Sequence, residues 1–279
     1  MMHLSTVHAC MQVLFHLTEV APAFSRSTKR LLTELLPHVA TAADVAVAVS
    51  GFVLPLAQAR AAALAAAADA CLYSSPPSTA VEAELRQPSA LAPLWVAMHD
   101  SVKENVALAA ALWDTCGEVS SHSVEFLDAV FVYTEAQAGE VRGAAARAAS
   151  HAASSDAALV AHVCAHAMGA SETMATSRRH GAAAVVSEVA SALSDPDEIA
   201  RVMQFILETG LIDRDNGVRS AYVDAGAAVV SGHGASQLQK LMPLIEEYLE
   251  NKNGLAEDLY DQARAPAPLP QVVLLGRCL

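Results

Sequence analysis

The segment Leu211–Gly232 reads LIDRDNGVRSAYVDAGAAVVSG, and it contains the pattern that decides the fold. A polar turn, Asp213–Gly217, leads into Val218–Arg219 and then into a run of small residues. Asp, Asn and Gly are typical of turns, because Asp and Asn bond nearby backbone groups and Gly tolerates left-handed backbone angles. Alanine has the highest helix propensity of any residue. The pattern therefore predicts a turn followed by a helix of small residues.

The same pattern recurs upstream. Thr134–Ser150 (TEAQAGEVRGAAARAAS) contains Val141–Arg142, and Ser177–Ala190 carries Arg179 in the equivalent place. The arginines are separated by 179 − 142 = 37 and 219 − 179 = 40 residues. A period of this size fits two helices and two turns, which is the size of a HEAT repeat.

Two further segments extend the pattern toward the N-terminus. In Asp100–Gly117, Val106 lies 141 − 106 = 35 residues before Val141, and Ala107 replaces the arginine. Leu56–Leu72 has the composition of another such helix. A more hydrophobic helix is expected before each of these segments, and the candidates are Ala43–Leu54, Ala92–His99, Ser123–Tyr133, Ala157–Met168, Ile199–Gly210 and Leu238–Glu250.

One helix pair cannot bury its own apolar face, so neighbouring pairs must stack. The sequence therefore predicts an all-α fold, a right-handed α-α superhelix of the HEAT/armadillo type. We expect the valines to face the core between helices. We expect each arginine to point into the turn, where it bonds an aspartate of its own or a neighbouring repeat and sets the stacking angle. The predicted structural repeat positions are Val141, Arg142, Arg179, Asp213, Val218 and Arg219.

Composition limits the classes of function. The 279 residues carry a net charge of −13, which argues against direct sequence-specific nucleic-acid binding. The five cysteines form no CxxC pair, as is usual for reduced thiols in the cytoplasm. The most apolar stretch, Ala42–Leu72, is interrupted by Asp44, Pro55, Arg60 and Asp69, so no membrane span is expected. Asp195–Pro196 is predicted to begin a helix.

Few residues suggest chemistry. His162 and His166 are four residues apart and share a helix face with Cys164 nearby, but no third ligand follows on that face. The sequence contains no GxSxG, GxGxxG or P-loop motif. We therefore expect no catalytic residue, no metal and no cofactor, and a protein that is not an enzyme. Trp95 and Trp113 are expected in the core between repeats.

Four regions are predicted: N-terminal HEAT-like helices in 1–73, a Pro/Ser-rich loop region in 74–93, HEAT repeats in 94–252 and an irregular tail in 253–279. Ser74–Thr79 and Gln87–Pro93 are the proline- and serine-rich stretches that define the loop. Ala265–Pro270 (APAPLP) cannot form a regular helix.

The stretch Met203–Lys252 is similar to part of the general-control (GCN) translational activators. The shared pattern is the Asp213–Asp215 turn, Val218–Arg219, a DAG-like helix, His233–Gly234, and a helix that ends in Glu246–Glu247–Tyr248–Leu249. Leu94–Ser150 also resembles this family, through Leu94–Trp95, Ala111–Trp113 and Glu140–Arg142.

The resemblance implies a cytoplasmic HEAT-repeat scaffold that associates with the ribosome and with an ABC-type ATPase partner. It also implies activation of the initiation-factor-2-alpha kinase in amino-acid starvation, through regions missing from this chain. Family members are far longer, so a partial chain is expected.

The alternative is a generic HEAT-repeat adaptor, such as a transport receptor, a phosphatase scaffold or a tubulin-binding array. A tubulin-binding array would need basic and aromatic residues at its turns, whereas these turns are mostly acidic or small.

Overall fold

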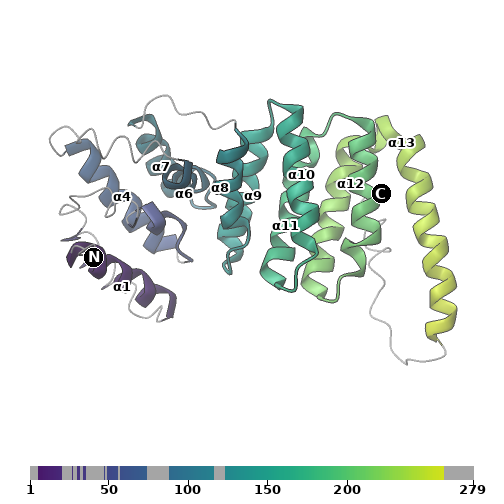
Figure 1. Cartoon of the computed structure of the whole chain (residues 1–279), viewed down its shortest axis with the longest axis horizontal. Helices are drawn as coiled ribbons and strands as arrows, with labels where there is room; N and C mark the ends of the chain where they lie inside the picture. Colours follow the sequence, from purple (N-terminus) through teal and green to yellow (C-terminus); the bar gives the residue numbers. More distant parts are fainter. Residues whose placement is uncertain are drawn as a thin grey trace. The chain divides into compact units, whose positions relative to one another are not determined.

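The computed structural model describes residues 6–20, 27, 30–31, 34–35, 47, 49–55, 57–73, 88–115 and 123–260. It divides into two compact units, Met1–Ala148 and Ala149–Leu279, and each is described by itself. Every regular element among the described residues is helical (Figure 1), so the prediction of an all-α fold is confirmed. None of these helices is both long and apolar enough to cross a membrane.

The described part of unit 1 consists of α1 (Thr6–Val20), the 3-10 helix η3 (Gly51–Val53), α4 (Ala57–Tyr73), α6 (Pro88–Ala97), α7 (Lys103–Thr115), α8 (Val124–Thr134) and the start of α9 (Gly139–Ala153). Helix α6 packs against α7 and α8, and α4 packs against α7 and η3. The second helices α4 and α7 of successive pairs therefore contact each other, and so do the first helices α6 and α8. Within one pair, α6 contacts α7.

Aromatic side chains form part of the unit 1 core. Trp95 is buried, and its indole Nε1 donates to the carbonyl of Ala148 at 2.9 Å. Its ring centroid lies 5.0 Å from that of the half-buried Trp113 and 6.0 Å from that of Phe126. The two tryptophans thus join the helices of neighbouring pairs.

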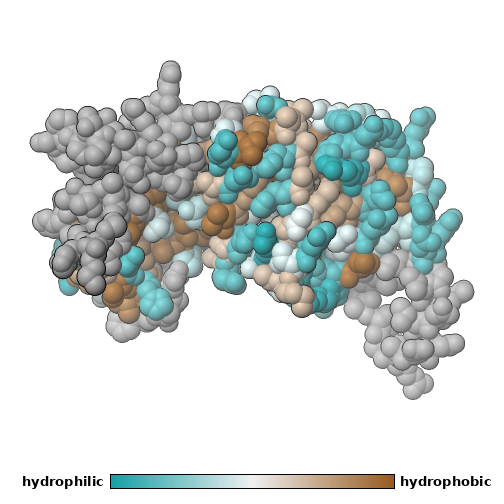
Figure 2. All heavy atoms as spheres, in the orientation of Figure 1, coloured by the Kyte–Doolittle hydropathy of each residue, from teal (hydrophilic) through white to brown (hydrophobic). Residues whose placement is uncertain are grey.

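Unit 2 contains α10 (Ala157–Ser171), α11 (Thr176–Val189), η4 (Ala190–Ala192), α12 (Pro196–Glu208), η5 (Gly210–Ile212) and α13 (Asn216–Tyr260). Helix α11 packs against both α10 and α13, and α12 packs against α13. The Asp195 carboxylate accepts from the backbone N–H of Asp197 with Pro196 in the first turn, so the predicted helix start is confirmed. In Figure 2 the surface over α12 and α13 is mostly hydrophilic, interrupted by a few apolar side chains.

Two element boundaries differ from the sequence prediction. Helix α6 begins at Pro88, inside the segment predicted as loop, because proline is tolerated in the first turn, where its missing N–H has no helical partner. Helix α13 is kinked at Gln237, directly before the predicted helix Leu238–Glu250, and its second part continues to Tyr260, inside the predicted irregular tail. Ser74–Thr79 and Ala265–Pro270 lie outside the described residues. The fourfold division of the chain stays a prediction.

Candidate functional site

Four arginines occupy the same place in their helices. Arg60 in α4, Arg142 in α9, Arg179 in α11 and Arg219 in α13 are each the fourth residue of the helix. Helical side chains lean toward the N-terminus, so a long side chain at this position covers the preceding turn. We call these four residues the arginine ladder.

Each ladder arginine donates from Nη1 to carbonyls of its own turn. The acceptors are five and six residues upstream: Leu54 (2.8 Å) and Pro55 (3.0 Å) for Arg60, Ala136 (2.8 Å) and Gln137 (2.6 Å) for Arg142, Thr173 (3.1 Å) and Met174 (2.9 Å) for Arg179, and Asp213 for Arg219. Partly buried carbonyls in a turn need such partners because the regular backbone hydrogen bonds of the helix do not include them. The ladder thus fixes the turn that joins the two helices of a pair.

In unit 2, Arg179 also bonds the next helix pair. Its Nε lies 2.7 Å from Asp213 Oδ2, and its Nη2 lies 3.3 Å from Asp213 Oδ1. Both side chains are buried or nearly so. Asp213 precedes α13, and its Oδ1 accepts from the backbone N–H of Asp215. One bidentate pair therefore joins two consecutive turns, which adds geometric specificity to the charge attraction.

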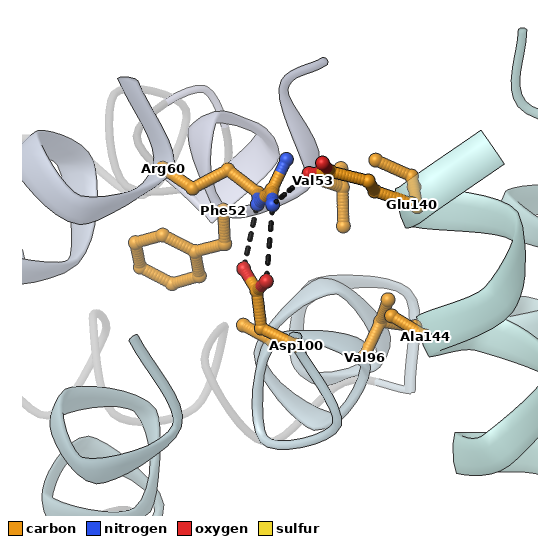
Figure 3. A pocket seen from close by; sticks show the side chains of 9 residues that line it. Phe52, Val53, Arg60, Val96, Asp100, Glu140 and Ala144 are labelled. Atoms are coloured by element: carbon orange, nitrogen blue, oxygen red, sulfur yellow. Dashed lines mark hydrogen bonds and ion pairs between the residues drawn. The ribbon is translucent and has the colours of Figure 1, made fainter. Parts of the chain in front are cut away.

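In unit 1, Arg60 makes the corresponding bond to Asp100 (Figure 3), with Nε–Oδ2 at 2.6 Å and Nη2–Oδ1 at 3.0 Å. Nη2 also donates to Glu140 Oε2 at 2.9 Å. Asn105 donates from Nδ2 to Asp100 Oδ2 at 2.9 Å. Arg60 and Asp100 are each 3% exposed, whereas Glu140 is 57% exposed. This Arg60 cluster connects α4, the turn before α7 and the start of α9.

The electrostatics of the Arg60 cluster favour the charged forms. Burial by itself raises the pKa of Asp100, but hydrogen bonds from Arg60, Asn105 and the backbone N–H of Val102 outweigh it, and the pKa lies below its ordinary value. Burial lowers the pKa of Arg60, and the bonds to Asp100 and Glu140 reverse this and leave it raised. The pair therefore stays ionised throughout the physiological range of pH.

The space beside the cluster is small. Phe52, Val96, Val141 and Ala144 line a cavity of about 10 Å³ next to Arg60 and Asp100. That is about the smallest volume that holds a water molecule. The site can order three helix pairs, but it has no room for a substrate.

The residues predicted from the sequence lie where the turns are built. Val141 and Val218 are buried, and Arg142 and Arg219 are half-buried over their turns. The structure brings Arg179, Asp213 and Arg219 together, since Asp213 accepts from Arg179 through its carboxylate and from Arg219 through its carbonyl. Their role in setting the stacking angle is a proposal.

Sequence reasoning missed the Arg60 cluster. Arg60 precedes Arg142 by 142 − 60 = 82 residues, close to two repeat periods, and this spacing was the available signal. The signal was weak because the repeat between Arg60 and Arg142 has no arginine at the corresponding position of α7.

In the structure, α7 aligns with the other second helices one residue away from the register that the sequence predicted. Val106, not Ala107, is the fourth residue of α7. Its N–H bonds the carbonyl of Val102, as the N–H of Arg142 bonds that of Ala138. Asn105 is fully buried in the place that Val141 holds in α9. Matching valine to valine gave the wrong register, because here the buried position has a polar side chain that serves Asp100.

Other polar groups offer little chemistry. The described residues contain no group of three or more His, Cys, Asp or Glu side chains that could hold a metal ion. Cys164 is buried in α10, and burial is the largest of the effects that raise the pKa of its thiol to about 12. A thiol with so high a pKa is a poor nucleophile, because the thiolate is the reactive form.

Antiparallel helix pairs whose turns are joined by arginine–aspartate bonds define a helical-repeat protein of the solenoid class. The family model described as "Stalled ribosome sensor GCN1, HEAT repeats" matches residues 79–170 and 160–276. The matches cover more than half of the chain, and the chain belongs to this family. The predicted family and the HEAT-type solenoid are therefore confirmed. The HEAT fold is a scaffold type.

Two relatives have similar sequences. Protein ILITYHIA of Arabidopsis thaliana is 33% identical over 86 residues, which is 31% of this chain and 3% of that protein. Stalled ribosome sensor GCN1 of Homo sapiens is 33% identical over 82 residues, which is 29% of this chain and 3% of that protein. The alignments thus span a small fraction of either relative.

Proposed function

We propose that this chain is a segment of a protein-interaction scaffold in translational control and that it associates with the ribosome. The observation that carries the proposal is the family match over residues 79–276, together with a relative whose name describes a sensor of stalled ribosomes. We further propose that the segment acts in the cytoplasm and has no catalytic activity of its own.

The finer parts of the proposal come from the resemblance of Met203–Lys252 and Leu94–Ser150 to the general-control activators. The scaffold would bind an ABC-type ATPase partner and take part in activating the initiation-factor-2-alpha kinase during amino-acid starvation. Contact with the kinase itself would lie in regions outside this chain.

The physical properties of the chain suit a scaffold. Buried bidentate pairs fix consecutive turns in each unit, so surface side chains are held in a constant arrangement. Pre-ordered side chains lose less conformational entropy when a partner binds. A net charge of −13 favours contact with basic protein surfaces over contact with RNA phosphates, apart from local cationic patches.

Co-sedimentation tests the proposal. The purified chain is shown by circular dichroism to be helical and is then centrifuged with cytosolic ribosomes over a salt series, with and without the ABC-type partner. We expect pelleting that depends on ribosomes or on the partner and that weakens as salt rises, because charge contacts are screened. The Asp100→Ala variant, which removes the aspartate of the Arg60 cluster, is the control. It shows whether pelleting requires a folded unit 1.

A folded chain that stays in the supernatant under every condition would contradict ribosome association by this segment. The generic HEAT-repeat adaptor would then be the better description. Unchanged pelleting of a chain shown to be unfolded would mean that the sedimentation is nonspecific.

A further inference from the structure

Asn216 and Gly217 form an exposed Asn-Gly sequence at the start of α13. The chain has four asparagines, and two of them, Asn216 and Asn253, precede a glycine. Glycine has no side chain to shield its backbone nitrogen, so that nitrogen can approach the amide of a preceding asparagine closely. Asn105, by contrast, is fully buried and is followed by the branched Val106. Among the asparagine side chains that the structure describes, Asn216 alone is exposed and followed by glycine.

The chemistry of an Asn-Gly sequence is an intramolecular displacement between adjacent groups. The backbone nitrogen of Gly217 loses its proton and attacks Cγ of Asn216. The Cγ–Nδ2 bond breaks, and the amide nitrogen takes up that proton and leaves as ammonia. Water then opens the resulting succinimide ring at either of its carbonyls, which gives aspartate or isoaspartate. The chain and water supply every atom of this reaction.

The carboxylate of Asp215 holds the nitrogen that would attack. Its Oδ1 accepts from the backbone N–H of Gly217 at 2.8 Å and from that of Val218 at 3.0 Å. The hydrogen bond from Val218 is the largest of the effects that lower the pKa of the Asp215 carboxyl, so the group is ionised at neutral pH. An N–H that donates to a carboxylate gives up its proton less readily. The helical backbone that begins at Asn216 also differs from the backbone that the ring requires. This cap therefore slows the reaction while the turn is formed.

Packing against α11 explains why the residue after Asn216 is a glycine. A Cβ at Gly217 would lie 2.9 Å from Cε1 and 3.0 Å from Nε2 of His180. The same imidazole lies 3.6 Å from Asp215 Oδ1, so His180 lies over this turn. The contact between the two helices thus keeps a reactive Asn-Gly sequence at the surface.

Isoaspartate at this position would disturb the start of α13. Its main chain runs through the former side chain and so gains one methylene group between Asp215 and the fully buried Val218. The helix start then cannot keep both its cap and its packed valine. Arg179 and Arg219 both bind Asp213, so the disturbance reaches the pair that joins this turn to α11. The aspartate product is tolerated, because negative charge is favourable at a helix N-terminus.

We propose that Asn216–Gly217 is a modification site, at which the chain forms succinimide and then isoaspartate at a rate set by the Asp215 cap. Opening of the turn before α13 releases the Gly217 nitrogen and allows the reaction. Isoaspartate at this site therefore accumulates in chains whose turn has opened and hinders the turn from closing again.

Ageing of the full chain at neutral pH, followed by digestion and mass spectrometry, tests this site. The amide and acid forms of a peptide differ in mass, and enzymatic methylation detects isoaspartate. Asp215→Ala should raise the rate at Asn216 by about fivefold or more, the factor expected for the loss of one hydrogen bond, and leave the rate at Asn253 unchanged. The matched control is Asp195→Ala, which removes the corresponding cap on the backbone N–H of Asp197 in α12. It should change the rate at Asn216 by less than about twofold.

Hydrogen exchange tests the consequence for the fold. Exchange of the backbone amides at the start of α13 should become faster in the aged wild type. It should not change in aged Asn216→Gln, whose longer side chain does not close the same ring readily. Equal exchange in the two aged chains, with isoaspartate present in the wild type, would overturn the proposed effect on the turn.

Guanidinium chloride removes the cap together with the fold, so Asn216 and Asn253 should react at similar rates in it. Equal rates at Asn216 in the folded wild type and in Asp215→Ala would overturn the role of the cap. Equal acceleration in Asp215→Ala and Asp195→Ala would overturn it too, because general loss of stability would then control the rate. Absence of isoaspartate at Asn216 from every folded chain, while it forms in the unfolded chain, would overturn the site itself.

Discussion

The Arg60 cluster of unit 1 and the Arg179–Asp213 pair of unit 2 solve one structural problem with different amounts of polar reinforcement. In both, the arginine binds its own turn through Nη1 and the aspartate of the next turn through Nε and Nη2. Unit 1 adds Glu140 and Asn105 to this arrangement. The shared part follows from the position of the arginine in its helix, whereas the additional partners depend on what neighbouring elements offer.

The two units also differ in how they fill the space beside a glycine that stands nine residues before a ladder arginine. These glycines are Gly51 in η3, before Arg60, and Gly210 in η5, before Arg219. The Phe15 ring and the Ala63 methyl group pack against Gly51, whereas the Tyr222 ring packs against Gly210. In both units the missing side chain of glycine makes room for an aromatic ring, which α1 supplies in unit 1 and α13 supplies in unit 2.

The largest effect is expected from removing the aspartates. Asp100→Ala leaves Arg60 buried without its main partner and should lower the free energy of unfolding of unit 1 by about 3–5 kcal/mol. Asp213→Ala should cost less, because Asp213 is more exposed and has fewer additional partners. Hydrogen exchange of the backbone amides in α4 and in α11 measures the loss of stability in each variant. Equal losses would contradict the expected difference between the two sites.

Overpacking at the glycine of unit 2 is expected to come next. A Cβ at Gly210 would lie 2.4 Å from Cγ of the buried Tyr222 ring, which cannot move without disturbing Phe205. Gly210→Ala should therefore lower the free energy of unfolding by about 1–3 kcal/mol in urea denaturation. Gly232→Ala, where a Cβ meets nothing within 4 Å, is the matched control and should be neutral or stabilising. Similar destabilisation in both variants would show that Tyr222 is not the cause.

A pH series sharpens the comparison at Asp100. Its pKa is lowered in the folded chain, so the unfolded chain takes up the proton first as the pH falls. The stabilisation by Asp100 is present above the unfolded pKa, near 4, and is lost as the pH falls through the folded pKa. The difference in stability between the wild type and Asp100→Asn should therefore be constant from pH 7 to about pH 5 and shrink below about pH 4. A difference that grows in acid would contradict this assignment.

The smallest effect is expected at an exposed pair. Lys240 in α13 lies 2.6 Å from Asp197 at the start of α12, and both side chains are largely in solvent. Lys240→Ala should leave the thermal midpoint unchanged within error, at low and high salt, because solvent screens the pair and side-chain entropy opposes it. A loss comparable to that of Asp213→Ala would mean that burial does not decide the strength of these pairs.

The repeat itself was open to prediction from particular residues. Val218–Arg219 and Val141–Arg142 indicated buried valines and arginines at turns, and the period of 37 to 40 residues indicated helix pairs. Arg179 could be paired with Asp213 in principle, because both stand at turns one repeat apart. Asn105 could not be predicted as a partner of Asp100, since a polar residue in a valine position reads as an exposed site. Glu140 could not be assigned to Arg60, which lies 80 residues away.

Arg214 shows a further limit. It follows Met174 by 40 residues, and nothing in its spacing marks Met174 as its partner. Only the structure shows that Arg214 donates to the Met174 carbonyl and so connects the turn before α11 to the turn before α13.

The sequence by itself determined that this chain is helical, that its helices come in pairs and that Arg142, Arg179 and Arg219 stand near the start of second helices. These properties follow from local propensity and from periodicity, both of which act within a few turns of the chain. The tertiary structure decided which carboxylate each arginine binds and which side chains are left exposed. Those outcomes depend on packing between residues one or two repeats apart, where burial makes an unpaired charge costly and sequence spacing fixes no partner.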